Sequence, residues 1–118
     1  MRKVIKISNK EYSMKSSAYT QFKYKNDTGR KLLDDIQQIS KINSLPEEEQ
    51  VGKTEDLIEL LLRIAYIMIE EADDKQVTTF DDFLKDIDGL FDNTDWIKEV
   101  IELAASPISR GIQAVPQE

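Results

Sequence analysis

The segment Leu57–Ile69 constrains this chain most, because almost every one of its residues is apolar. Four polar side chains lie in it or directly after it, at spacings of 4, 3 and 4 residues: Glu59, Arg63, Tyr66 and Glu70. In an α-helix this spacing places them on one narrow stripe. A helix that is apolar on its other sides is buried over most of its surface. The segment therefore predicts the central helix of a bundle.

Residues 3–14 predict a short β-hairpin at the start of the chain. Val4, Ile5 and Ile7 are β-branched, Ser8-Asn9-Lys10 is a turn sequence, and the next residues alternate between apolar and polar. An isolated hairpin is only marginally stable in water. We therefore expect it to pack against helices.

Two amphipathic helices are expected between the hairpin and the central helix. The first should begin at Ser16 or Ser17 and end near Thr28, where Gly29 can take the left-handed conformation. Its predicted buried stripe is Ala18, Tyr19 and Phe22. The second covers residues 30–42, in which Leu and Ile recur at three- and four-residue spacing.

A loop is expected before the central helix. The acidic run 47–49 and Gly52 indicate an exposed, mobile segment, because acidic runs and glycine are typical of loops. Thr54 is then the predicted N-cap of the central helix, with two acidic residues in its first turn.

Two further helices are predicted after the central one. Thr79 and Asp82 form a start similar to a capping box for the first, which should end at Gly89. Its expected apolar side chains are Phe80, Phe83, Leu84 and Ile87. Asn93 or Thr94 caps the last helix. Its expected apolar face is Trp96, Ile97, Val100, Ile101 and Ala104.

The end of the chain is predicted to leave the helical body. Ser106-Pro107 should stop the last helix, and residues 107–118 contain two Pro, one Gly and no clear periodicity. We therefore expect a flexible tail over 107–118 and a single helical domain over 1–106, near the usual domain size. The predicted fold is mainly α: a helical bundle of four to five helices with a short N-terminal β-hairpin.

Charge divides the chain into a basic start and an acidic remainder. Residues 1–31 carry nine Lys and Arg against two Asp and Glu, whereas the other 87 residues carry seven against 21. Two complementary surfaces favour contacts within the fold or head-to-tail between copies. Weak self-association is therefore predicted, with Lys3, Lys6 and Lys10 as candidate contact residues. The acidic remainder repels phosphate, so no nucleic-acid partner is expected.

Composition argues against catalysis. The chain has no His and no Cys, so it lacks the commonest general base, the thiol nucleophile and the usual zinc ligands. Four adjacent carboxylate pairs are interpreted as solvated helix faces or turns: Asp34-Asp35, Glu70-Glu71, Asp73-Asp74 and Asp81-Asp82. A calcium-binding loop that starts at Asp73 fails, because Lys75, Val77 and Thr78 occupy positions that need oxygen ligands or glycine. We expect a non-catalytic binding protein without metal or cofactor.

The order of segments over about residues 3–105 has a counterpart in a known family. A basic hairpin leads to a short helix that ends at Thr28-Gly29, then to an Arg-Lys-Leu-Leu helix and an acidic linker. An apolar helix ending in Glu-Glu-Ala-Asp, the string Val-Thr-Thr-Phe-Asp-Asp-Phe-Leu at 77–84 and a Trp-bearing C-terminal helix follow. This order resembles the tail assembly chaperones of long-tailed phages and prophages of Gram-positive bacteria.

The resemblance implies a small, mostly helical protein that coats the tape-measure protein before the tail tube polymerises around it. The tail tube protein is a second candidate partner. Such a protein works in the cytoplasm of the bacterial host and is absent from the finished virion. Many members of the family also exist in a longer form made by ribosomal frameshifting.

Two alternatives remain open at this point. The aromatic side chains Phe80, Phe83, Phe91 and Trp96 are either a groove for a partner or, as we favour, ordinary core. The rival function is an acidic regulatory or inhibitory protein of a phage or mobile element that occupies a basic host surface. The longest apolar stretch is too short to span a bilayer and no secretory signal is evident, so we expect no membrane partner and a cytoplasmic location.

Overall fold

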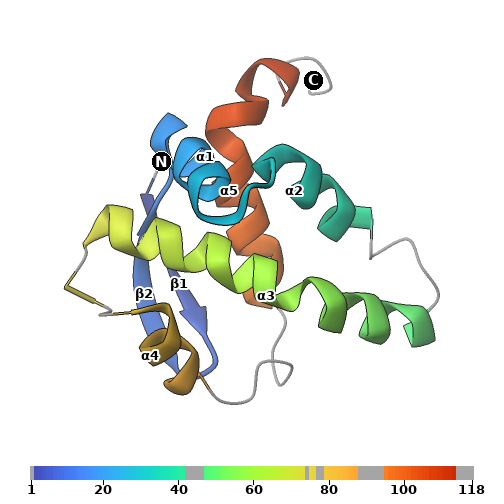
Figure 1. Ribbon diagram of the computed structural model, residues 1–118, viewed down its shortest axis with the longest axis horizontal. Helices are drawn as coiled ribbons and strands as arrows, with labels where there is room; N and C mark the ends of the chain where they lie inside the picture. Colours follow the sequence, from blue (N-terminus) through green and yellow to red (C-terminus); the bar gives the residue numbers. More distant parts are fainter. Residues whose placement is uncertain (1, 42–46, 74, 77–78, 88–94, 114–118) are drawn as a thin grey trace.

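The computed structural model describes residues 2–41, 47–73, 75–76, 79–87 and 95–113 of the chain. Within these residues there are five helices and one two-stranded antiparallel sheet (Figure 1). In chain order they are β1 (Arg2–Ile7), β2 (Lys10–Lys15), α1 (Ala18–Thr28), α2 (Leu32–Ser40), α3 (Glu47–Ala72), α4 (Phe80–Lys85) and α5 (Asp95–Gln113). The predicted mainly α fold with an N-terminal hairpin is confirmed.

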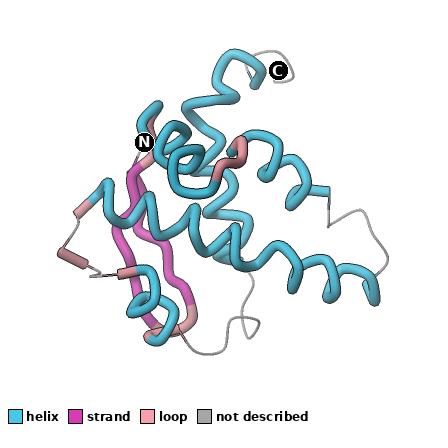
Figure 2. The backbone as a smooth tube through the Cα atoms, in the orientation of Figure 1, coloured by secondary structure: helices cyan, strands magenta, loops and turns pink. Residues whose placement is uncertain are grey.

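The hairpin packs one face onto the helices. A loop of two residues, Ser8 and Asn9, joins the strands, and Ser8 has the positive φ of 60° that short hairpin loops favour. The strands lie side by side behind α3 (Figure 2), with α3 in contact with β2 and α5 in contact with β1. The face toward these helices carries the fully buried Ile5, Ile7, Tyr12 and Met14. Alternation along each strand leaves the other face to solvent.

Helix α3 is the centre of the core, as its apolar sequence predicts. Its buried residues are Leu61, Leu62, Ile64, Ala65, Ile67, Met68 and Ile69. The predicted polar stripe lies on the remaining side, where Glu59 is exposed and Arg63, Tyr66 and Glu70 are partly buried. The Arg63 guanidinium lies over the ring of Phe80, 4.3 Å from its centroid, so the stripe also packs against α4.

The loop predicted before the central helix is wrong, because α3 is already helical from Glu47. Glutamates in a first turn interact favourably with the positive end of the helix. Gly52 lies inside the helix, where glycine costs only about 1 kcal/mol relative to alanine. Thr54 is therefore an interior residue of α3 and not its N-cap.

Both C-terminal helix boundaries also differ from prediction. α4 ends at Lys85 with Asp86 as its C-cap, short of Gly89, which lies outside the described residues together with the predicted caps Asn93 and Thr94. The predicted stop at Ser106-Pro107 is wrong, because α5 continues through Pro107 to Gln113. An interior proline loses one helical hydrogen bond. Contacts of α5 with α1, α2, α3 and β1 stabilise the helix against that loss.

The buried stripe predicted for α1 is wrong as well. Ala18, Tyr19 and Phe22 are all exposed, and the buried residues of this helix are Thr20 and Tyr24. The helix itself begins and ends as predicted, with Ser17 as N-cap and Gly29 in the left-handed conformation at φ 73°. α1 thus turns inward a face with two hydroxyl-bearing side chains, Thr20 and Tyr24, and turns Tyr19 and Phe22 outward.

Candidate functional site

The N-terminus of α1 is held by a carboxylate of α3. The Ser17 hydroxyl donates to Glu71 Oε2 at 2.5 Å, and the Thr20 hydroxyl donates to Glu71 Oε1 at 2.6 Å. The same two side chains close the capping box, since the Ser17 N–H donates to Thr20 Oγ1 and Ser17 Oγ accepts from the Tyr19 N–H. One carboxylate therefore fixes the first turn of α1 against the last turn of α3.

A second carboxylate, this one fully buried, holds the C-terminal half of α1. Asp35 of α2 is 1% exposed, and its Oδ2 accepts from the Tyr24 hydroxyl at 2.5 Å. Arg30 binds the same carboxylate with both ends of its fork, Nε to Oδ2 at 2.8 Å and Nη2 to Oδ1 at 2.7 Å. The left-handed Gly29 turns the chain so that α2 folds back beside α1.

These contacts shift the pKa values of the groups involved. Burial alone would raise the pKa of Asp35, but the hydrogen bonds from Arg30 and Tyr24 and the Arg30 charge lower it below its usual value. Burial and the hydrogen bond to Asp35 raise the pKa of Tyr24 above its usual value. The prediction that Asp35 and Glu71 belong to solvated carboxylate pairs is therefore wrong. Their hydroxyl partners lie up to 54 residues away in the chain, beyond any local pattern.

The outward face of α1 exposes two aromatic side chains. Tyr19 is 56% exposed and Phe22 is 66% exposed, and their spacing of three residues places them on one side of the helix. We call these two residues the aromatic pair. Beside Tyr19 lies an open pocket of about 270 Å³ between α1 and α3, lined by Tyr19, Lys23, Ile67, Glu70 and Glu71.

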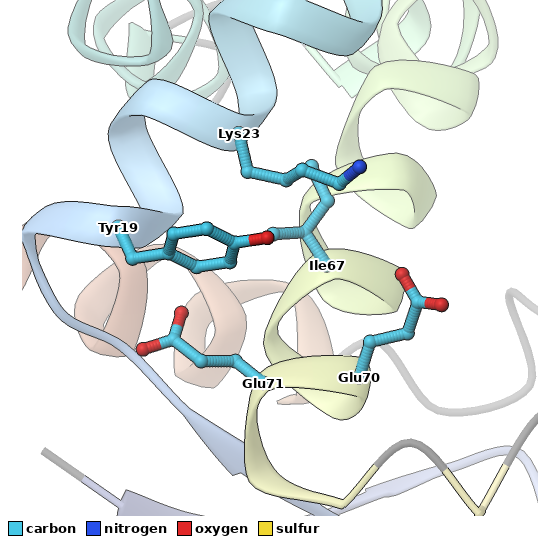
Figure 3. A pocket seen from close by; sticks show the side chains of 5 residues that line it. All are labelled: Tyr19, Lys23, Ile67, Glu70 and Glu71. Atoms are coloured by element: carbon cyan, nitrogen blue, oxygen red, sulfur yellow. The ribbon is translucent and has the colours of Figure 1, made fainter.

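The charged groups around this pocket are bound to partners within the protein. Figure 3 shows the Tyr19 ring between Lys23 and Glu71, with its hydroxyl directed toward α3. Lys23 Nζ lies 3.2 Å from Asp27, whose hydrogen bond and charge raise the pKa of Lys23. Glu70 accepts from the Tyr66 hydroxyl at 3.1 Å, and burial together with Glu70 raises the pKa of Tyr66 to about 12. The surface of the pocket itself is more polar than apolar, so the apolar area that this side of the protein offers a ligand is that of the aromatic pair.

The three lysines predicted as contact residues are divided by the alternation of the strands. Lys3 and Lys10 lie on the inward face, where Lys3 pairs with Glu99 of α5 at 3.2 Å and Lys10 approaches Asp86 to 3.9 Å. Lys6 lies on the outward face and is exposed. The basic start of the chain thus contacts its own acidic remainder at two of the three positions.

The predicted aromatic partner residues lie mainly in the core. Phe83 and Trp96 are each 1% exposed, and Phe80 is partly buried. Phe83 packs edge-on against Tyr12 with ring centroids 5.5 Å apart, and Phe80 packs against Tyr66 at the same distance. We call Tyr12, Tyr66, Phe80 and Phe83 the aromatic cluster. Phe91 lies outside the described residues.

Among the described residues, no group of three or more Asp and Glu side chains comes together as ligands for a metal ion. Residues 74, 77 and 78 of the rejected calcium loop lie outside the described part of the chain. No described helix combines the length and the apolar character needed to cross a membrane.

Comparison of the chain with protein-family models, with curated proteins and with solved structures finds no match. The resemblance to tail assembly chaperones therefore stays a prediction made from the sequence.

Proposed function

We propose that this protein is a tail assembly chaperone that binds apolar helices of the tape-measure protein in the host cytoplasm, without catalysis. The observation that carries the proposal is the outward aromatic pair on a helix whose inward face is already satisfied by polar contacts. The mostly helical fold agrees with what the resemblance implies.

Tyr19 and Phe22 have apolar surface that the fold does not bury. A buried Tyr or Phe contributes roughly 150–250 Å² of contact, and Tyr is enriched among the residues that dominate binding energies. Tyr19 and Phe22 contribute little of that area to the fold, since both are more than half exposed. An amphipathic helix lying along α1 would cover the aromatic pair and place polar side chains toward Lys23 and Glu70 at the margin of the contact.

Repetition of such a contact explains how a small protein could keep a very long apolar rod in solution. Each copy would cover a few helical turns, and the acidic surface of the copies would face the solvent. Self-association along the rod, and contact with the tail tube protein, remain parts of this proposal. Because Lys3 and Lys10 already pair internally, Lys6 is the better candidate for a charge contact between copies.

The decisive experiment is co-expression with the tape-measure protein, which the resemblance places in a very long neighbouring gene. We expect the wild-type protein to keep it soluble and to co-purify with it. The double variant Tyr19→Ser, Phe22→Ser should lose both effects. The double variant Gln21→Ser, Lys25→Ser alters two exposed residues of the same helix and should retain them.

The outcome separates the proposal from its rival. An acidic inhibitor would bind a basic host protein through charge. Its complex would therefore dissociate at high salt and would still form when the aromatic pair is removed. Retention of the tape-measure protein by the Tyr19→Ser, Phe22→Ser variant would contradict the proposed surface. Failure of the wild-type protein to bind it at all would contradict the proposed function.

A further inference from the structure

The two edges of the hairpin differ. Val4 and Ser13 stand opposite each other in the register, one pair away from Ile5 and Tyr12. Next to a two-residue loop, Ile7 pairs with Lys10 through the ladder hydrogen bonds, and this pattern repeats at every second pair. The backbone N–H and C=O groups of Val4 and Ser13 therefore point away from each other, toward the two outer edges.

The edge of β2 is occupied by a side chain. Gln76 lies just after α3, and its Oε1 accepts from the Ser13 N–H at 2.8 Å while its Nε2 donates to the Ser13 carbonyl at 2.9 Å. The same Nε2 lies 3.3 Å from the Ile69 carbonyl. One amide thus makes the two hydrogen bonds that a third strand would make at Ser13, and it ties them to α3.

The edge of β1 has no such cover within the described part of the chain. No described residue hydrogen-bonds the outward N–H or C=O of Val4 or Lys6. The Val4 side chain is 57% exposed, and Arg2 and Lys6, two residues to either side, are exposed on the same face. An unpaired strand edge of this kind is a template for an added strand.

We propose that the β1 edge binds an extended, acidic segment of a partner protein as a third strand of the sheet. The outward face of the hairpin carries three cations, Arg2, Lys6 and Lys15, against the single acid Glu11. In an added strand, every second side chain lies on this face. A segment with an aliphatic residue opposite Val4 and acids two positions to either side would match it in apolar contact and in charge.

A second copy of β1 does not satisfy the same edge. Antiparallel pairing centred on Val4 would set Arg2 of one copy opposite Lys6 of the other, twice over. Like charges directly opposite each other destabilise a strand pair. The cations therefore discourage sheet growth between copies and leave the edge available to an acidic strand. This inference does not depend on the proposed function or on the aromatic pair.

Amide hydrogen exchange provides a direct test. The probe is the blocked peptide Thr-Glu-Thr-Val-Thr-Glu-Thr, and the control peptide replaces both Glu by Lys. Saturating acidic peptide should slow exchange of the Val4 and Lys6 amides by about tenfold or more, because outward amides become part of a ladder. The Ile5 amide already belongs to the β1–β2 ladder and should change little. The Lys peptide should have no effect.

Two kinds of variant distinguish strand addition from simple charge attraction. Val4→Pro removes the outward N–H but no ladder bond, and it should abolish binding, whereas Val4→Thr keeps the N–H and should bind. The double reversal Arg2→Glu, Lys6→Glu leaves the backbone intact and should also abolish binding, while Lys25→Glu on α1 should not. Binding that survives Val4→Pro in a folded protein, or that leaves Val4 exchange unchanged, would overturn the proposal.

Discussion

The aromatic cluster packs into the body of the protein, whereas the aromatic pair is exposed to solvent. Phe80 and Phe83 of the cluster have helical spacing, and so do Tyr19 and Phe22, yet the first two pack into the body and the second two face solvent. On α4 the polar residues Asp81 and Asp82 are exposed, and the two rings pack inward. On α1 the hydroxyls of Thr20 and Tyr24 find carboxylates on α3 and α2, and they hold the inward face instead. Aromatic spacing therefore identifies a face but not its direction.

Truncation of the cluster should have the largest effect on folding. Phe83→Ala removes a fully buried ring that touches Tyr12, Tyr66 and Phe80, and we expect it to lower the free energy of unfolding by about 3–5 kcal/mol. Urea denaturation followed by circular dichroism measures this loss. A value below about 1 kcal/mol would remove the distinction between the cluster and the pair.

The polar face of α1 should come next. Asp35→Asn removes the charge that binds Arg30 and weakens the acceptor of the Tyr24 hydroxyl, and we expect a loss of about 2 kcal/mol. The loss stays below that of a fully buried ion pair, because Arg30 is partly exposed and can rehydrate. Asp34→Asn, on the exposed neighbour, is the matched control and should cost little.

This contribution should depend on pH in one direction. The folded pKa of Asp35 lies below its unfolded value of about 3.9, so its stabilisation is present above about pH 4 and is lost as the pH falls through the folded pKa. Wild type and Asp35→Asn should therefore differ in unfolding free energy at pH 7 and converge in acid. A difference that does not shrink as the pH falls below about 4 would show that the charge is not its source.

The clamp at the N-terminus of α1 should contribute somewhat less. Glu71→Gln keeps the shape and one acceptor oxygen but places an NH2 donor opposite the other hydroxyl, so one charge-assisted hydrogen bond becomes neutral and the other is lost in its present direction, and about 1–2 kcal/mol should be lost. Glu70→Gln next to it affects one bond, to the Tyr66 hydroxyl at 3.1 Å, and should cost less. Equal losses of unfolding free energy in urea titrations of both variants would mean that the Ser17 and Thr20 contacts of Glu71 stabilise the fold no more than the single Tyr66 contact of Glu70 does.

The aromatic pair should have the smallest effect on stability. Tyr19→Ser and Phe22→Ser remove side chains that are mostly in water, and each should change the free energy of unfolding by no more than about 0.5 kcal/mol. Partner binding should nevertheless disappear in the double variant. A loss above about 1.5 kcal/mol would make the pair part of the fold and would remove the reason to treat it as a binding surface.

Much of the fold follows from local sequence. The interior of α3, the hairpin and the caps at Ser17, Gly29 and Thr79 all depend on neighbours within a few residues, and all were predictable. The acidic run and Gly52 predict a loop over residues 47–53, because both are typical of loops, but these residues belong to α3.

The candidate site was less predictable, since its geometry is set by distant partners. Glu71 lies 51 residues from Thr20, and no spacing rule links a hydroxyl to a carboxylate over that distance. Alternation could have predicted that Lys3 and Lys10 lie on one face of the hairpin and Lys6 on the other. Successive side chains of a strand point to opposite faces, so the register alone is enough to assign them. Which side faces the acidic helices came only from the tertiary structure.

The two hydrogen bonds between the Gln76 side chain and the Ser13 backbone have a consequence for synthesis on the ribosome. Ser13 and Gln76 are 63 residues apart, so at about 5–20 residues per second the hairpin is made roughly 3–13 s before the amide that covers its β2 edge. During that interval both edges of a marginally stable hairpin are open, in a cell crowded with other nascent chains. Until the helices are made, the hairpin has nothing to pack against, and the repulsion between the cations Arg2, Lys6 and Lys15 of different copies is what discourages pairing. Synthesis of Gln76, just after α3, ends the exposure of the β2 edge with a single side chain that reaches back to the beginning of the protein, and only the β1 edge stays open.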